Sequence, residues 1–148
     1  MTPPAEYRRA AFSISTDPGR LDIAAIHEFL TQSYWSPGVP LDVVKRAIQG
    51  SLCFGLYEGI RQIGFARVIT DQATYAYVAD VYVLESHRGQ GLGVWLMETI
   101  MAYPALQGLR RMGLVTRDAH RLYEKLGFTP LAHPERHMEI ARPDIYRC

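Results

Sequence analysis

Apolar residues recur every three or four positions in four stretches of the chain, and this spacing predicts four helices. The stretches are 21–33, 41–48, 91–103 and 118–126. The third is the strongest, because its apolar residues fall on a single face. These residues are Leu92, Trp95, Leu96, Thr99, Ile100 and Tyr103. Gly50 and Gly127 follow the second and fourth stretches, where a glycine commonly ends a helix.

Runs rich in β-branched and aromatic residues predict strands before and between these helices. We expect a first short strand within 8–16, after which Asp17 caps the following helix. Glu58-Gly59 is typical of a hairpin turn, so the next strands should form an antiparallel meander. The meander strands are 51–57, 62–70 and 75–84; a later strand is 112–116, and possible closing strands are 128–132 and 137–140.

The length of the chain, 148 residues, matches one domain, so we expect a single domain over 1–148. The order of elements predicts an α/β (α+β) fold, with helices packed on a mixed sheet. We expect about six or seven strands and about four helices. A composition of 48% apolar and 21% charged residues excludes a disordered, collagen-like or coiled-coil protein.

Charge and cysteine content narrow the class of protein. The 16 basic residues nearly balance the 15 acidic ones, so we expect no nucleic-acid partner. Cys53 and Cys148 are too few for a disulfide framework, and free thiols suit a reducing compartment. No apolar run reaches the ~18 residues of a membrane span, and residues 1–9 lack the apolar stretch of a signal peptide. We therefore expect a soluble cytoplasmic protein without a membrane partner.

A glycine-rich loop, Arg88-Gly89-Gln90-Gly91-Leu92-Gly93, joins the last meander strand to the third helix. Glycines let a backbone turn tightly and approach a ligand closely, because they carry no Cβ. The first N–H groups of a helix are unpaired and lie at its positive end, so the loop is typical of a phosphate site. The alternative is a tight strand-to-helix turn that binds nothing.

The spacing of the glycines excludes two better-known phosphate loops. A Walker A loop requires a Gly-Lys-Ser/Thr sequence, and this loop has no lysine. A dinucleotide-binding fingerprint requires Gly-x-Gly-x-x-Gly after the first strand of a βαβ unit, with an acidic residue about 20 positions later. Here the glycines stand at 89, 91 and 93, the preceding strand comes late in the chain, and position 113 is Gly.

The loop resembles the Arg/Gln-x-x-Gly-x-Gly/Ala signature of the GCN5-related N-acetyltransferases (GNAT family), whose loop holds the pyrophosphate of acetyl-CoA. Two further segments strengthen the resemblance. Asp80-Val81-Tyr82-Val83-Leu84-Glu85 resembles the family's strand beside the pantetheine arm, and His120-Arg121-Leu122-Tyr123-Glu124-Lys125-Leu126-Gly127-Phe128 resembles its late helix with a recurrent tyrosine. The first ~75 residues match the family only in the order of elements.

The resemblance implies a set of residues that bind acetyl-CoA. The backbone of the strand should contact pantetheine, and one backbone N–H there should point at the thioester oxygen. The loop should hold the pyrophosphate. Thr116 stands where the family often has an asparagine that contacts the cofactor, and Asp118 and His120 are the alternatives for that contact. The implied cofactor-binding residues are Val81, Tyr82, Val83, Arg88, Gly89, Gln90, Gly91, Leu92, Gly93 and Thr116.

Acetyl transfer to an amine calls for a base, an oxyanion donor and a proton donor for the leaving thiolate. The resemblance implies that Tyr123 lies near the sulfur, where a phenol of pKa ~10 can donate a proton. The alternative is that Tyr123 is only a core aromatic. We expect Asp80 to be the base, because it lies between apolar neighbours near the implied reaction centre. Glu85, His120 and a chain of water molecules are the alternatives.

The acceptor is expected to be a primary amine, either a small molecule or a protein amine. Tyr34 and Trp35 fall where the family builds its acceptor pocket, and the alternative is that they close the core. The lack of an acidic cluster near Tyr34 argues against polyamines and basic peptides. We expect no metal site, since Pro134 lies between His133 and His137.

Two functions therefore fit the sequence. The first is an acetyl-CoA-dependent N-acetyltransferase, and the second is a non-catalytic module that binds acetyl-CoA as a sensor or partner domain. Tyr123 favours the enzyme, because binding alone needs no proton donor. A homodimer is compatible with the resemblance, since dimers are common in the family.

Overall fold

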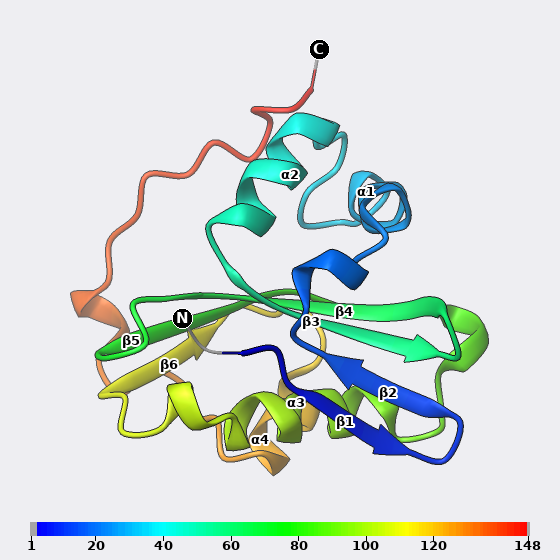
Figure 1. Cartoon of the computed structure of the whole chain (residues 1–148). Helices are drawn as coiled ribbons and strands as arrows, with labels where there is room; N and C mark the ends of the chain where they lie inside the picture. Colours follow the sequence, from blue (N-terminus) through cyan, green and yellow to red (C-terminus); the bar gives the residue numbers. More distant parts are fainter. Residues whose placement is uncertain (1–2, 148) are drawn as a thin grey trace.

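Six strands form one mixed sheet in the computed structural model, which describes residues 3–147 (Figure 1). The strands are β1 (Glu6–Arg9), β2 (Phe12–Ser15), β3 (Leu52–Glu58), β4 (Arg61–Thr70), β5 (Tyr75–Val83) and β6 (Arg111–Leu114). They lie in the sheet in chain order, and neighbours from β1 to β5 are antiparallel. β5 and β6 are parallel, so the chain between them must cross over one face of the sheet.

Four helices cover the two faces of the sheet, which confirms the predicted fold class (Figure 1). α1 (Ile23–Thr31) and α2 (Leu41–Gln49) lie on one face. α3 (Leu92–Ala102), which makes the crossover from β5 to β6, lies on the other face with α4 (His120–Lys125). Three helices are shorter than the predicted stretches by at most two residues at each end, and α2 extends one residue further, to Gln49.

Each face of the sheet has its own apolar core. The larger core packs α3 against the strands, and all six residues predicted for the inner face of this helix, Thr99 among them, are buried. The smaller core packs α1 and α2 against the strands and contains Cys53. Burial raises the pKa of the Cys53 thiol to about 12. Alternate side chains of one strand point to opposite faces, so the same strands supply both cores.

The beginning of the chain differs from the sequence prediction in two ways. Residues 8–16 do not form one strand, because Ala10 adopts a left-handed conformation (φ 52°) and turns the chain into the β1–β2 hairpin. Asp17 does not cap α1; it caps a single 3₁₀ turn by accepting a hydrogen bond from the N–H of Gly19. The cap of α1 is Asp22, whose carboxylate accepts the N–H of Ala25 at 3.0 Å.

The predicted closing strands 128–132 and 137–140 are wrong for the described chain, in which neither segment is a strand. The chain after α4 instead runs past the end of the sheet to α2, where Tyr146 packs beside Gly38 (Figure 1). Two prolines help to explain this path. Pro130 lacks an N–H for a ladder, and Pro134 begins a 3₁₀ turn at 134–136.

None of the helices within residues 3–147 has both the length and the apolar character needed to cross a membrane. The longest, α3, has 11 residues, whereas a transmembrane helix needs about 20.

Candidate functional site

A β-bulge interrupts β5 at Asp80. Across the β4–β5 ladder, Phe65 pairs with Tyr82 and Arg67 pairs with Ala79, so two residues of β5 oppose the single residue between Phe65 and Arg67. Asp80 has φ 55°, which lies in the left-handed region that non-glycine residues rarely adopt. Such a conformation costs about 1–2 kcal/mol, so surrounding contacts must hold it.

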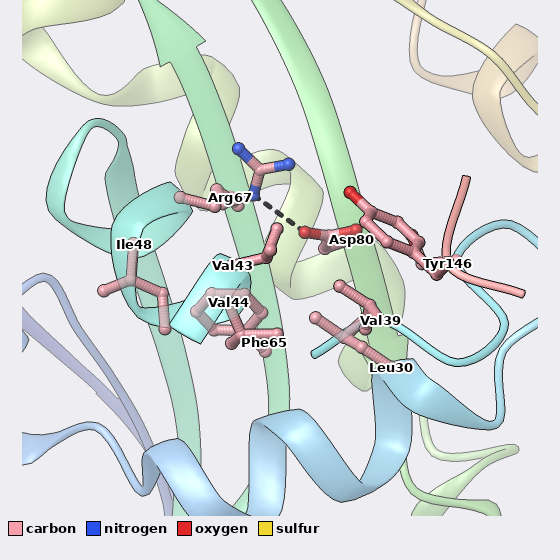
Figure 2. Close-up of a pocket in the computed structure, with 11 residues that line it drawn as sticks. Leu30, Val39, Val43, Val44, Ile48, Phe65, Arg67, Asp80 and Tyr146 are labelled. Carbon is pink, nitrogen blue, oxygen red and sulfur yellow. Dashed lines mark hydrogen bonds and ion pairs between the residues drawn. The ribbon is translucent and has the colours of Figure 1, made fainter. Parts of the chain in front are cut away.

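The bulge reverses which face of the sheet the side chains of β5 meet. Before the bulge, Ala76 and Val78 belong to the core under α3. In a regular strand every second side chain points to the same face, so Tyr82 would join Ala76 and Val78 in that core. Tyr82 instead belongs to the core of α1 and α2, where it stacks on Phe29 with ring centroids 3.8 Å apart. The Asp80 side chain therefore lies on the face covered by α1 and α2, beside Arg67 (Figure 2).

Asp80 is held by two side chains from other elements. The Nε of Arg67 donates to one carboxylate oxygen at 2.7 Å, and the indole Nε1 of Trp35 donates to the other at 2.9 Å. Arg67 also donates to the hydroxyl of Ser51 at 3.1 Å. The side chains of Arg67 and Asp80 are only 16% and 10% exposed. A buried ion pair is tolerated when further hydrogen bonds satisfy its polar atoms, and here Trp35 and Ser51 supply two of them.

A cavity of about 100 Å³ lies beside this ion pair (Figure 2). Arg67 and Asp80 form its polar end, and Tyr146 from the C-terminal segment forms one wall. The other walls are mostly aliphatic and come from α1, α2 and the chain between them. These lining residues include Leu30, Val39, Val43, Val44 and Ile48.

The predicted acceptor residues adjoin both predicted catalytic residues, because Trp35 donates to Asp80 and Tyr34 lies near Tyr123. The rings of Tyr34 and Trp35 meet edge to face at 5.1 Å, and both side chains are partly exposed. The Tyr34 hydroxyl accepts a hydrogen bond from the N–H of Arg117 at 3.3 Å, which connects it to the loop before α4. The structure thus brings the four predicted catalytic and acceptor residues to one region.

Tyr123 is half-buried on α4, with its ring 5.7 Å from that of Phe128. Burial, with a smaller contribution from the nearby Tyr34, raises the pKa of the Tyr123 phenol above its usual value of 10.0. The phenol therefore stays protonated throughout the neutral range. The alternative bases predicted from the sequence, Glu85 and His120, are both exposed.

The glycine loop has the backbone geometry of an anion cradle. Gly89 and Gly91 have φ of 80° and 76°, and a Cβ added at either would meet no atom within 4 Å. Gly91 precedes α3 without a side-chain cap, and the first backbone bond of the helix runs from the N–H of Trp95 to the carbonyl of Gly91. The N–H groups of residues 92–94 therefore remain available to an anion.

The remaining predicted cofactor residues make local contacts. Arg88 lies folded back, with its Nε donating to the carbonyl of Val83 at 3.0 Å, and Gln90 donates to the carbonyl of His87 at 3.4 Å. The hydroxyl of Thr116 accepts the N–H of Ala119 at 3.0 Å and stabilises the turn before α4. Their roles toward acetyl-CoA stay predictions. In the part of the chain described, no three His, Cys, Asp or Glu side chains gather as metal ligands would.

Sequence reasoning missed Arg67, Phe29 and Tyr146. Arg67 had a usable signal, because a charged residue inside the apolar run 62–70 requires a buried partner, and Asp80 is the acid inside the neighbouring run. Phe29 and Tyr146 had none. Their roles depend on how α1 and the C-terminal segment pack, and no local pattern encodes that packing.

Comparison with known proteins identifies the family. Residues 49–130 match the model of the acetyltransferase (GNAT) domain. A candidate acetyltransferase of the fungus Gibberella zeae is 34% identical to this chain, over 84% of this chain and 82% of the relative.

Solved structures give the same result. A candidate GNAT-family acetyltransferase from Xanthomonas campestris pv. campestris is 50% identical and superimposes with a TM-score of 0.91, over 93% of this chain and 97% of that one. A Clostridium acetobutylicum acetyltransferase solved with acetyl-CoA has a TM-score of 0.64 over 88% of this chain and 94% of that one. Its identity is 14%, so it supports the fold alone.

Proposed function

This chain belongs to the acetyltransferase (GNAT) family, and we propose that it moves the acetyl group of acetyl-CoA to a primary amine by direct attack of the amine on the thioester. One observation carries the proposal. Asp80 at the bulge of β5 lines a partly apolar cavity under α2, and the anion cradle at the start of α3 follows the same strand. A cofactor and an acceptor can therefore meet beside β5.

The residues of the glycine loop fit the pyrophosphate of acetyl-CoA. The two left-handed glycines leave open space where side chains would stand, and the uncapped N–H groups of α3 can donate to phosphate oxygens. Arg88 adds a positive charge once its side chain leaves the Val83 carbonyl. A protein of the same fold, the Clostridium acetobutylicum acetyltransferase, was solved with acetyl-CoA. Acetyl-CoA supplies the activated acetyl group as a thioester.

We assign the oxyanion donor to a backbone N–H at the bulge, that of Val81. A bulge leaves its extra residue outside the ladder, so an N–H there is free to donate to a substrate oxygen. A fixed donor of this kind is worth about 3–4 kcal/mol of transition-state stabilisation in other enzymes. The backbone N–H and C=O groups of Val81 and Val83 then lie beside the pantetheine arm, where the sequence resemblance predicts them.

We assign Tyr123 as the general acid. Its raised pKa keeps the phenol protonated, so it can donate that proton to the sulfur of the departing CoA. The partly exposed Tyr34 and Trp35 lie beside it and border the acceptor side. An aromatic border suits an alkylamine, which can contact the rings through its carbon chain.

We assign Asp80 a positioning role in preference to the role of base. Both of its carboxylate oxygens already accept hydrogen bonds, from Arg67 and Trp35, and these contacts hold the left-handed bulge that presents Val81. Proton removal from the amine then falls to a water chain that reaches solvent along the exposed edge of Trp35.

The experiment is Tyr123→Phe, assayed by release of the CoA thiol with a panel of small primary amines. Loss of the acid should lower kcat by about 10²–10⁴-fold, while the Kd for acetyl-CoA measured by calorimetry stays unchanged. In the wild type, the midpoint of the fall of kcat at high pH should lie above the ordinary tyrosine range, because burial raises the pKa of Tyr123.

Three results would contradict the proposal. If the Tyr123→Phe variant kept full kcat, the acid would have to be another group. If the wild type bound acetyl-CoA but turned over no amine in the panel, the non-catalytic binding module would be favoured. If it bound neither acetyl-CoA nor CoA, the cradle assignment would be wrong.

A further inference from the structure

We propose that the acceptor is a small free amine whose aliphatic chain, of about four carbon atoms, occupies the cavity under α2, and that Tyr146 sets the longest chain accepted. This inference rests on the proposed function and names the substrate class of the same site. It selects between the two acceptors that the sequence left open, because it favours a small molecule over a protein amine.

The volume of the cavity limits the size of the group that it can hold. The cavity measures about 100 Å³. In another protein, an apolar cavity of about 150 Å³ holds one molecule of benzene. In proportion, the cavity under α2 suits an aliphatic chain of about four carbon atoms.

The chemistry of the walls determines which way an amine enters. Arg67 and Asp80 form the polar end, and their opposite charges leave the pair neutral overall. Val44 and Ile48 of α2 and Phe65 of β4 line the apolar part and belong to the smaller core. Burying an alkylammonium group among such side chains is costly, so the amine stays beside Asp80 and the carbon chain enters the apolar part.

This orientation places the amine where the proposed reaction needs it. Each carboxylate oxygen has two lone pairs, so Asp80 can accept a hydrogen bond from the amine in addition to those from Arg67 and Trp35. Asp80 immediately precedes Val81, whose N–H we assign as the oxyanion donor. A lysine side chain of a protein cannot bind in this way, because its carbon chain continues into a backbone that a cavity of this volume cannot hold.

Tyr146 is the wall that limits the length of the chain (Figure 2). Among the lining residues of the described chain, it is the only one from the segment after α4, so replacing it opens the cavity without disturbing a helix or a strand. Its neighbours hold it in place. The N–H of Arg147 donates to the carbonyl of Asp144 at 3.0 Å, and a Cβ on Gly38 would lie 3.1 Å from the Tyr146 carbonyl.

The first test compares linear primary amines, from ethylamine to hexylamine, as acceptors of the wild-type enzyme. Each methylene group that enters the apolar part should raise kcat/KM about fourfold, up to butylamine. Longer chains overfill the cavity, so hexylamine should be at least about 10-fold poorer than butylamine. A profile that does not depend on chain length would overturn the inference, and so would a preference for a lysine-containing peptide.

The second test moves the limit. Tyr146→Ala removes the aromatic wall, so kcat/KM for hexylamine should rise at least about 10-fold. Ile145→Ala is the matched control, because Ile145 is 62% exposed and does not line the cavity, and its profile should equal that of the wild type. Val43→Phe fills the cavity from a half-exposed position of α2 and should shift the preference to shorter amines.

Each variant tests a separate part of the inference. An unchanged chain-length preference in Tyr146→Ala would overturn the role of Tyr146. An unchanged preference in Val43→Phe would overturn the use of the cavity by the acceptor.

A binding measurement separates failure of this inference from failure of the proposed function. We would titrate ¹⁵N-labelled protein, saturated with CoA, with butylamine and follow the amide shifts of residues 43–48 by NMR. These shifts should saturate and give a Kd without turnover. Saturation without acetylation of any amine would support the cavity as the amine site and contradict the proposed acetyl transfer. Acetylation of amines without shifts at residues 43–48 would overturn this inference and leave the proposed function in place.

Discussion

The two sides of the bulge at Asp80 differ in the atoms that form them, which are backbone atoms on one side and side chains on the other. On the side that we propose for the cofactor, the site is formed by backbone, with two left-handed glycines and the uncapped start of α3. On the side that we propose for the acceptor, it is formed by side chains, with Trp35, Asp80 and Arg67 joined by hydrogen bonds. The shape of the cofactor side depends on the φ angles of the glycines and on the open space beside them. The shape of the acceptor side depends on hydrogen bonds between particular side chains.

This difference affects how readily the two sides of the site can change in sequence. A backbone cradle tolerates most changes outside its glycines, because few side chains contribute to it. On the acceptor side, replacing any one of these side chains alters the geometry, because each is hydrogen-bonded to another. We therefore expect acceptor choice to vary among relatives more than cofactor choice, and four substitutions sharpen the comparison.

The largest effect is expected from Arg67→Lys on the acceptor side. Lysine keeps the charge but cannot reproduce the planar donors that Arg67 gives to Asp80 and Ser51. The bulge should shift, and misplacement of a reacting group by about 1 Å costs about 100-fold in kcat. Steady-state kinetics would measure this loss, and calorimetry should give an unchanged Kd for acetyl-CoA.

The pH profile of the Arg67→Lys variant separates the two roles of Asp80. A positioning role predicts the same fractional loss of kcat at every pH, because no titrating base has been removed. If Asp80 is instead the base, the acid limb of the profile should move. Trp35→Phe, which removes only the indole donor, is the milder companion and should lower kcat by about 10-fold.

A smaller effect is expected from Gly91→Ala on the cofactor side. Alanine at φ 76° is strained by about 1–2 kcal/mol, and its Cβ enters the open space of the cradle. The Kd for acetyl-CoA should rise by about 10-fold, with kcat little changed at saturation. Gly59→Ala is the matched control. Gly59 also has a positive φ and open space, but it lies in the β3–β4 turn, so acetyl-CoA affinity should not change.

The smallest effect is expected from Thr116→Val, which removes the hydroxyl that accepts the N–H of Ala119. One lost hydrogen bond costs about 1 kcal/mol, so the melting temperature should fall by a few degrees. If Thr116 only stabilises the turn, acetyl-CoA affinity stays the same. A clear rise in the Kd would mean that Thr116 also contacts the cofactor, as its sequence position predicts.

The sequence predicted well the elements whose signals are local. The inner face of α3 follows from the spacing of apolar residues, and the meander β3–β4–β5 follows from apolar runs and short turns. The glycine loop was located from its residues alone. Each of these elements is specified by neighbours in the chain, so pattern and propensity suffice.

The features that depend on distant contacts were not predicted. Nothing near Asp80 indicates a left-handed bulge, which is held by Arg67 and Trp35 from other elements. The segment 137–140 carries a strand pattern, yet in one chain it finds no partner strand. Periodicity predicts what a segment prefers, and the available partners decide what it becomes.

The burial of Cys53 affects assays that use thiol reagents. With a pKa of about 12, only about one molecule in ten thousand carries a thiolate there at pH 8. A thiol reagent that reports released CoA would therefore react very slowly with this residue in the folded protein. Rapid reaction at Cys53 would report that α2 has separated from the sheet, so the same reagent can follow unfolding during an assay.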